Sequence, residues 1–271
     1  MSVYNYDENK YPLIKVLMRT YGEHKTLTEE AIYSFLQQYY PNKQLIILNT
    51  HKDPIKFDKK YDNIQVIERP CCLSNMVEKT EYLIKQVKNG LFCVFDDDDI
   101  ILPHHLSQLY RIWIKYKNEY NKDILCVSPG QYYYHNVSKD NFLKKNYTNW
   151  CCHLFDINDG IKFYSLLKQM LEYEHASGQD SYFMSIYKED WKRIEDRSFS
   201  ATYVYRWGTG SYHLSGKGRC GHDPQIKKIN SVNKKNIVEK FNPHQKIDYV
   251  RRVDDFIDSF QKTSPLVGGD E

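Results

Sequence analysis

The sequence predicts a Rossmann-like α/β fold, with one mostly parallel central sheet and helices on both of its faces. Strand and helix signals alternate through the first half of the chain, as consecutive parallel strands require. The continuous apolar run LFCVF over residues 91–95 is typical of a central parallel strand. Four aspartates, Asp96 to Asp99, follow this run directly. Because ligands bind beyond the carboxyl ends of strands in such sheets, the acidic run stands where a ligand would bind.

Short apolar runs predict the strands of the first half. They are expected over residues 13–18, 45–48, 64–67 and 91–95. Between the first two strands, the sequence TLTE fits a capping box with Thr26 as the N-cap of a helix. Apolar residues then recur at helical spacing until Pro41, which ends the helix. Further helices are expected over about 75–88 and 103–117.

The second half of the chain is less regular. A strand is expected over residues 124–127, and residues 130–150, rich in Tyr and Asn, are interpreted as an excursion from the sheet. Helices are expected over about 160–174, 180–194 and 244–261. Residues 216–236 carry Gly and Lys without periodicity, which indicates a long loop.

Composition narrows the classes of protein. With 271 residues, 41% hydrophobic and 27% charged, the chain resembles an ordinary globular protein. Its formal net charge of +3 does not by itself indicate nucleic-acid binding. The N-terminus lacks the features of a signal peptide, and no apolar run reaches the ~18–20 residues of a membrane span, so a cytoplasmic protein without a transmembrane segment is expected. The seven cysteines include no CxxC pair, which favours free thiols over a zinc site.

The acidic run predicts a cation site. Four adjacent carboxylates repel one another unless a cation is present. Mg²⁺ and Mn²⁺ commonly bridge carboxylates and substrate phosphates, and such a metal would neutralise the charge on a departing diphosphate. A solvated acidic turn is the alternative interpretation, but the position directly after a buried strand favours the functional one.

Three segments of the first half resemble family 2 glycosyltransferases. The sequence FDDDDIILPHHL around Asp96 resembles the family's D-x-D-D segment, in which a Pro and a Leu follow at this spacing. Arg19-Thr20-Tyr21 resembles the family's T-Y-N turn, and residues 34–42, SFLQQYYPN, resemble its S-x-L-x-Q-x-Y-P-N helix end. These segments occur in the family's order over about residues 12–106. The resemblance implies the GT-A fold, a nucleoside-diphosphate sugar as donor, and Mn²⁺ or Mg²⁺ as cofactor.

The resemblance also implies roles for the acidic residues. Asp98 would be the principal metal ligand. Asp96 would contact the donor ribose or the metal, and Asp99 would support the sugar or the metal. Asp97, which lies between them, is expected among the donor-binding residues.

Thr20 and Tyr21 would line the nucleoside pocket by the same resemblance. The family usually carries an Asp pair after its second strand, where one Asp reads the base. This chain has Asn49-Thr50 at that position. The amide of Asn49 can still pair with a base edge, so a UDP-sugar is only slightly favoured over other donors.

The second half is expected to supply the general base. Transfer with inversion needs a group that takes the proton of the acceptor hydroxyl. The family supplies it as the Asp of a Glu-Asp pair at a helix start, and Gln179-Asp180 is the best match, with Gln179 replacing the Glu. Asp180 could instead act only as a helix cap. His213 fits the place where many GT-A enzymes take a further metal ligand, although a lone His is often only a packed residue.

The sequence therefore predicts a metal-dependent, inverting glycosyltransferase. Residues 1–106 would form the nucleotide-sugar-binding half, residues 107–263 the acceptor and catalytic half of the same domain, and residues 264–271 a flexible tail. The acceptor hydroxyl would belong to a glycan, a protein or a small molecule. Two alternatives stay open: transfer to hydroxylated bases in DNA, and an inactive nucleotide-sugar-binding module, which the substitutions at Asn49 and Gln179 allow.

Overall fold

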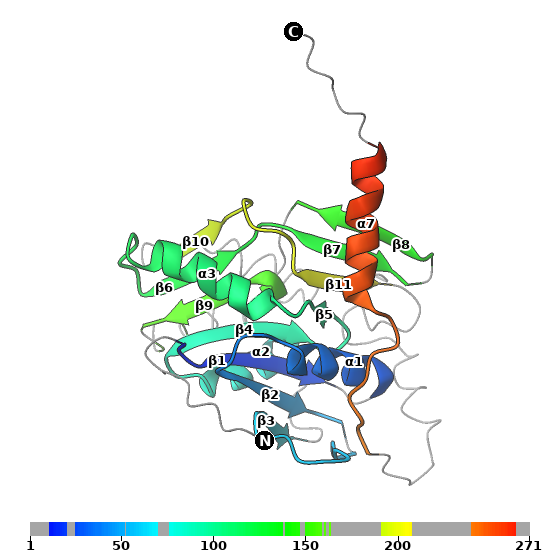
Figure 1. Ribbon diagram of the computed structural model, residues 1–271. Helices are drawn as coiled ribbons and strands as arrows, with labels where there is room; N and C mark the ends of the chain where they lie inside the picture. The colour runs from blue at the N-terminus through cyan, green and yellow to red at the C-terminus, as the bar shows by residue number, and fades with distance from the viewer. Residues whose placement is uncertain are drawn as a thin grey trace.

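Two sheets organise the part of the chain that the computed structural model describes (Figure 1). The described residues are 11–20, 25–51, 53–69, 76–137, 139–146, 150–158, 160, 163, 191–207 and 240–263. The larger sheet has the order β10-β6-β9-β4-β1-β2-β3 and the smaller one the order β5-β11-β7-β8.

The strands and helices have the following bounds, given for each sheet and then for the helices. The larger sheet consists of β1 (Ile14–Thr20), β2 (Lys43–Asn49), β3 (Ile64–Glu68), β4 (Gly90–Asp96), β6 (Ile124–Ser128), β9 (Leu154–Ile157) and β10 (Trp191–Glu195). The smaller sheet consists of β5 (Ile100–Ile101), β7 (Tyr132–Asn136), β8 (Asn141–Lys145) and β11 (Tyr203–Trp207). The helices are α1 (Lys25–Leu36), α2 (Met76–Lys85), α3 (His105–Lys117) and α7 (Tyr249–Thr263), with a short 3₁₀ turn η1 (Trp150–Cys152).

The predicted α/β class and the mainly parallel sheet are confirmed. β1 pairs in parallel with β2 and β4, β2 with β3, and β10 with β6. β9 is the exception and runs antiparallel to both β4 and β6. α2 contacts β1 and β2, and α3 contacts β6 and β9. β1, β2 and β4 are buried along most of their length, which explains the apolar runs in their sequences.

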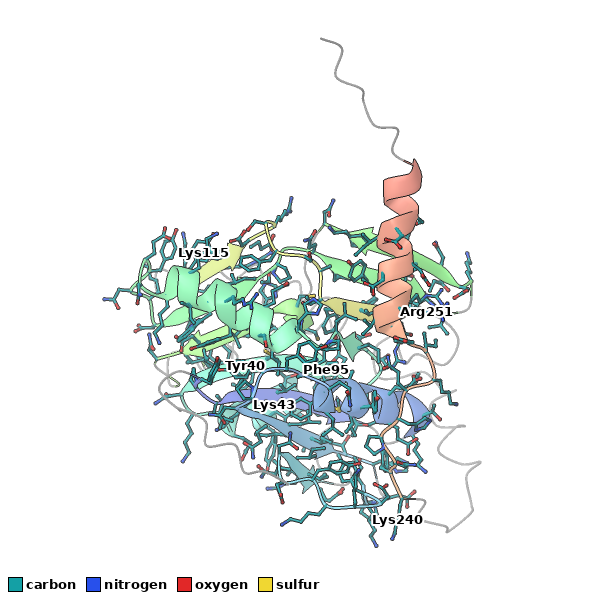
Figure 2. All side chains as sticks on the ribbon, in the orientation of Figure 1. Tyr40, Lys43, Phe95, Lys115, Lys240 and Arg251 are labelled. Atoms are coloured by element: carbon teal, nitrogen blue, oxygen red, sulfur yellow. The ribbon has the colours of Figure 1, made fainter. Side chains whose placement is uncertain are left out.

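Many residues of the buried core are aromatic, and Figure 2 labels two of them, Tyr40 and Phe95. Phe92 stacks on Phe155 with ring centroids 4.9 Å apart, across the β4–β9 pair. Tyr40 is 1% exposed and donates a hydrogen bond to the Pro12 carbonyl at 2.7 Å. Phe95 is equally buried at the end of β4. The rigid core therefore reaches directly to the residue that precedes the acidic run.

Several local predictions were wrong in detail. α1 already includes Lys25, so Thr26 lies inside the helix and is not its N-cap. α7 begins at Tyr249, later than the predicted 244. Residues 191–195 form a strand instead of the end of the helix predicted over 180–194, because Trp191 and its neighbours complete a parallel ladder with β6. The excursion over residues 130–150 contains the β7–β8 hairpin of the second sheet.

Two composition-based expectations can be compared with the described residues. Cys93, Cys126, Cys151 and Cys152 are buried, and no two of them form a disulfide with each other. Among the described residues, no helix is long and apolar enough to cross a membrane.

Candidate active site

The carboxyl ends of three parallel strands bring the predicted site residues together. Thr20 at the end of β1 lies opposite Asn49 at the end of β2, and Arg19 lies opposite Asp96 at the end of β4. Asp96 to Asp99 then form a turn that leads into β5, in which the Asp99 amide donates to the Asp96 carbonyl at 3.4 Å. We call these four residues the acidic turn. It occupies the sheet edge at which α/β proteins bind ligands.

Asp99 is bound on both of its carboxylate oxygens. The Tyr203 hydroxyl donates to Oδ2 at 2.6 Å, and the Arg206 amide donates to Oδ1 at 2.8 Å. The residue is 0% exposed. Burial raises the pKa of Asp99 well above its usual value, and the charge of Asp98 adds to this. The contacts give Asp99 a structural role in joining the acidic turn to β11, while its predicted contact with the donor stays a prediction.

Asp96 is held by a buried cation. Its Oδ1 lies 2.5 Å from Nη2 of Arg19, whose Nη1 donates to Oγ1 of Thr80 at 2.6 Å. The Cys151 thiol donates to the other oxygen, Oδ2, at 3.3 Å. These contacts fix the carboxylate at the end of β4, and they compensate one of the four negative charges of the acidic turn.

Asp97 and Asp98 are neighbours in the acidic turn, and their negative charges repel each other. Asp97 is half-buried and accepts a hydrogen bond from Thr28 Oγ1 at 3.4 Å and another from Thr20. Burial raises the pKa of Asp97 to about 7, and the nearby charge of Asp98 contributes, although the Thr20 hydrogen bond acts in the other direction. Asp98 is 6% exposed. Two crowded carboxylates of this kind would be stabilised by a cation.

The chemistry of these two carboxylates fits a divalent cation. Among the described residues, no group of three or more His, Cys, Asp or Glu side chains is arranged to hold a metal ion. Mg²⁺ and similar ions are, however, usually held by only one or two carboxylates, with water and substrate phosphates as the remaining ligands. Asp97 and Asp98 could supply that pair, and the donor diphosphate could complete the coordination.

Asn49 is fully buried in a local network. Its Nδ2 donates to the Asp53 carbonyl at 2.9 Å and to Oε2 of Glu68 at 2.7 Å, and its Oδ1 accepts from the His51 amide at 3.0 Å. The other Glu68 oxygen accepts from the Ile55 amide at 2.9 Å. The asparagine therefore fastens the segment after β2 to the end of β3. Its predicted pairing with a nucleobase stays a prediction.

This network predicts that Asn49→Asp will destabilise the protein, although aspartate is the residue that the family usually carries there. A carboxylate cannot donate to Glu68 or to the Asp53 carbonyl, and it would repel the Glu68 carboxylate. We expect the free energy of unfolding, measured by urea denaturation, to fall by about 1–2 kcal/mol. The double variant Asn49→Asp, Glu68→Gln should recover much of the loss, because the glutamine amide can donate to the aspartate. An Asn49→Asp single variant as stable as the wild type would contradict this interpretation.

Several residues that surround the acidic turn are absent from the predicted site. Arg19 and Arg206 are buried cations beside it, at 6% and 2% exposure. Lys79 in α2 is 1% exposed, and burial, followed by the charge of Arg19, lowers its pKa to about 7. Charged residues inside strands that are otherwise apolar were the signal for both arginines, since buried charges are normally paired.

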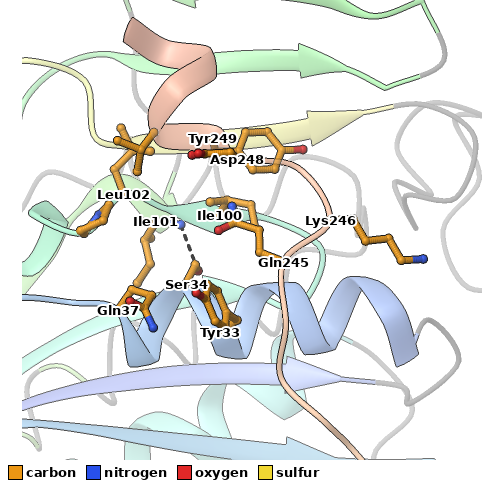
Figure 3. Close-up of a pocket in the computed structure, with 12 residues that line it drawn as sticks. Tyr33, Ser34, Gln37, Ile100, Ile101, Leu102, Gln245, Lys246, Asp248 and Tyr249 are labelled. Carbon is orange, nitrogen blue, oxygen red and sulfur yellow. Dashed lines mark hydrogen bonds between the residues drawn. The ribbon is translucent and has the colours of Figure 1, made fainter.

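A row of buried polar residues on α1 and just beyond its end was also missed. Ser34 Oγ accepts from the Ile101 amide at 3.3 Å (Figure 3). Gln38 Nε2 donates to the Ile101 and Leu102 carbonyls at 3.2 and 2.8 Å. Glu30, one turn earlier, binds Arg206. The spacing of four residues was the available signal for Glu30 and Ser34, because residues at i and i+4 share one face of a helix.

Three predicted site residues lie outside the described residues: Tyr21, Asp180 and His213. The structure therefore brings together Thr20, Asn49 and the acidic turn, and it leaves the general base and the further metal ligand as predictions.

Comparisons with known proteins place these observations in context. The model of glycosyl transferase family 2 matches residues 15–187, well over half of the chain and including the acidic turn. A search of curated proteins found no match. Among solved structures, S. aureus TarS 1-349 in complex with UDP-GlcNAc is similar with a TM-score of 0.47 and 15% identity, over 73% of this chain and 60% of that chain. The complex of the same protein with UDP gives a TM-score of 0.46, 15% identity, and coverage of 72% and 60%. This chain thus spans less than two thirds of TarS 1-349.

Proposed function

Because the chain belongs to glycosyl transferase family 2, we propose that it transfers a sugar from a nucleoside-diphosphate sugar to a hydroxyl acceptor, with the acidic turn as the centre of the donor site. The observation that carries the proposal is the position of Asp96 to Asp99. They follow a buried parallel strand, at the carboxyl edge of the sheet, inside the segment that the family model matches.

The proposed division of labour follows from the contacts. Asp98, with Asp97 or Asp96 beside it, would hold a Mn²⁺ or Mg²⁺ ion. When bound, the ion supplies positive charge that stabilises the departing diphosphate. Arg19 fixes Asp96 through its ion pair, and Asp99 ties the acidic turn to Tyr203 and Arg206. Both residues would act by keeping the turn in one conformation, which is the way preorganised sites stabilise developing charge.

The acceptor side of the proposal rests on the family resemblance. Asp180 would take the proton of the acceptor hydroxyl as that oxygen attacks the anomeric carbon. The nucleoside diphosphate would leave from the opposite face, so the configuration at that carbon would invert. The acceptor is proposed to be a hydroxyl of a glycan, a protein or a small molecule. Transfer to DNA bases has no support in the family match, and we do not propose it.

A thermal-shift screen tests the donor assignment. A ligand that binds only the folded state raises its apparent stability, by about 2.7 kcal/mol when present at a hundred times its dissociation constant. UDP-, GDP-, CDP- and ADP-sugars should be compared with and without Mn²⁺. We expect one donor class to raise the melting temperature by several degrees, with the larger shift in the presence of Mn²⁺. No shift with any nucleotide sugar would contradict the proposed function.

A further inference from the structure

Arg206 touches the acidic turn through both its backbone and its side chain. Its amide donates to Oδ1 of Asp99 at 2.8 Å, and its Nε donates to the Asp98 carbonyl. One residue of β11 therefore binds the last two residues of the turn. Because Arg206 is 2% exposed, its own side chain is shielded from solvent, and any effect on a bound donor would pass through the turn.

The guanidinium of Arg206 is in turn fixed by α1. Nη1 donates to Oε2 of Glu30 at 2.5 Å, and Nη2 donates to the Leu27 carbonyl at 3.3 Å. With the hydrogen bond from Nε to the Asp98 carbonyl, the planar guanidinium therefore makes contacts through all three of its nitrogens. A lysine could keep the charge, but a single ammonium on a flexible stem cannot reproduce this planar geometry.

Glu30 is itself positioned by the C-terminal segment. Its second oxygen, Oε1, accepts from the Lys246 amide at 2.9 Å, and the neighbouring Glu29 accepts from the Asn242 amide at 2.7 Å. Both glutamates are less than 5% exposed. The segment that leads into α7 passes close to α1 and β5, and its residues line a cavity of about 360 Å³ with them (Figure 3).

The segment that follows the acidic turn is held by α1 and the residues just after it. Ser34 in α1 and Gln38, two residues beyond its end, bind the backbone of Ile101 and Leu102. The turn is therefore fixed at Asp96 by Arg19, at Asp98 and Asp99 by Arg206, and beyond its end by α1. Arg206 is the contact that joins β11, α1 and the turn at one point.

We propose that Arg206 is a positioning residue for the acidic turn, and that Glu30 holds its guanidinium in the required orientation. This inference rests on the proposed function of the turn as the donor site. The competing interpretation is a buried ion pair that contributes only to stability. The two differ in a testable way, because a buried pair that serves stability alone can often be replaced by apolar residues without loss.

Three variants separate these interpretations. The double variant Arg206→Met, Glu30→Met removes both charges of the buried pair, so neither partner is left as an unpaired buried charge. Arg206→Lys keeps the charge and loses the planar geometry. Arg252→Met is the matched control, because it removes the ion pair between Arg252 and the exposed Asp140 at the β8 end of the molecule. For each variant we would measure melting temperature, steady-state kinetics, and hydrogen–deuterium exchange of peptides that cover residues 96–102.

A positioning role predicts a loss of turnover that exceeds the loss of stability. In the double variant and in Arg206→Lys, kcat should fall by about 10- to 100-fold at a temperature where both are folded, since small misplacements of reacting groups have effects of this size. Exchange over residues 96–102 should accelerate by about tenfold or more, because the local opening of the turn becomes easier. Arg252→Met should leave both quantities at wild-type values.

The measurements distinguish failure of the inference about Arg206 from failure of the proposed function. Wild-type kcat and wild-type exchange over residues 96–102 in Arg206→Lys, or in a folded double variant, would overturn the inference. If the double variant does not fold, Arg206→Lys alone decides. If the wild type transfers no sugar from any donor, the proposed function fails, and the exchange measurement still decides whether Arg206 sets the conformation of the turn.

Discussion

Replacing Asp98 by asparagine is expected to abolish sugar transfer and to leave the fold intact. The substitution keeps the size of the side chain and removes one of the two carboxylates that are proposed to bind the metal. It leaves the Asp98 carbonyl free to accept its hydrogen bond from Arg206. Loss of a charge-stabilising group at a reaction centre commonly costs about 10²–10³ in kcat, and loss of the metal itself should cost more.

The same substitution should not destabilise the protein without metal. The negative charge of Asp98 is one reason why the pKa of Asp97 is raised to about 7. A carboxyl whose pKa is raised on folding contributes stability at low pH and loses that contribution as pH rises through the folded-state value. For Asp97 the window runs from about 4 to about 7. Asp98→Asn should therefore raise the melting temperature at pH 7.5, and it should change it less at pH 4.5.

A control substitution makes the result specific. Asp62→Asn removes an exposed carboxylate, paired with exposed Lys60, two residues before β3 and away from the acidic turn. It should leave kcat and the melting temperature unchanged, because exposed ion pairs contribute little. Near-normal turnover in Asp98→Asn would show that Asp98 is not the principal metal ligand.

The second large effect is expected for Asp180→Asn. If Asp180 is the general base, kcat should fall by about 10²–10⁴-fold, as is typical when acid–base catalysis is lost. Donor affinity should change little, since the diphosphate is proposed to bind at the acidic turn. Steady-state kinetics with varied donor concentration measures both quantities.

Asp180→Ala distinguishes the base from a helix cap. A residue that acts only as a cap predicts nearly normal turnover in Asp180→Asn, because asparagine caps helices as well as aspartate, and a stability loss of about 1 kcal/mol in Asp180→Ala. A general base predicts a large kinetic loss in both. Normal turnover in Asp180→Asn would show that Asp180 is not the general base.

The parts of the fold that sequence analysis predicted well depend on local pattern. The strand predicted over 91–95 is β4, and the acidic turn follows it as expected, because a buried parallel strand needs an uninterrupted apolar run. The strand predicted over 124–127 is β6 for the same reason. The end of the helix predicted over 180–194 was wrong because pairing of β10 with β6 is a long-range contact that no local pattern records.

The second sheet and the partners of the buried polar residues around the site could not be predicted from local sequence pattern. β5 has two residues, and it pairs antiparallel with β11, about a hundred positions later in the chain. The partner of Arg206 is Glu30, which lies 176 positions earlier in the chain. Asn49 was predicted to read the base, which stays a prediction, and its hydrogen bond to Glu68 on the neighbouring strand was not foreseen. In these cases the residues are visible in the sequence, but only the topology identifies their partners.

Release of nucleoside diphosphate tests the central claim most directly. The wild-type chain and Asp98→Asn should be incubated with each nucleotide sugar in the presence of Mn²⁺, and then with EDTA, while free nucleoside diphosphate is quantified. Water can replace an unidentified acceptor, so slow hydrolysis of the donor is sufficient. Our account predicts that the wild type releases the diphosphate from one donor class in a Mn²⁺-dependent reaction, and that Asp98→Asn does not. Absence of release from every donor, or equal release by Asp98→Asn, would contradict it.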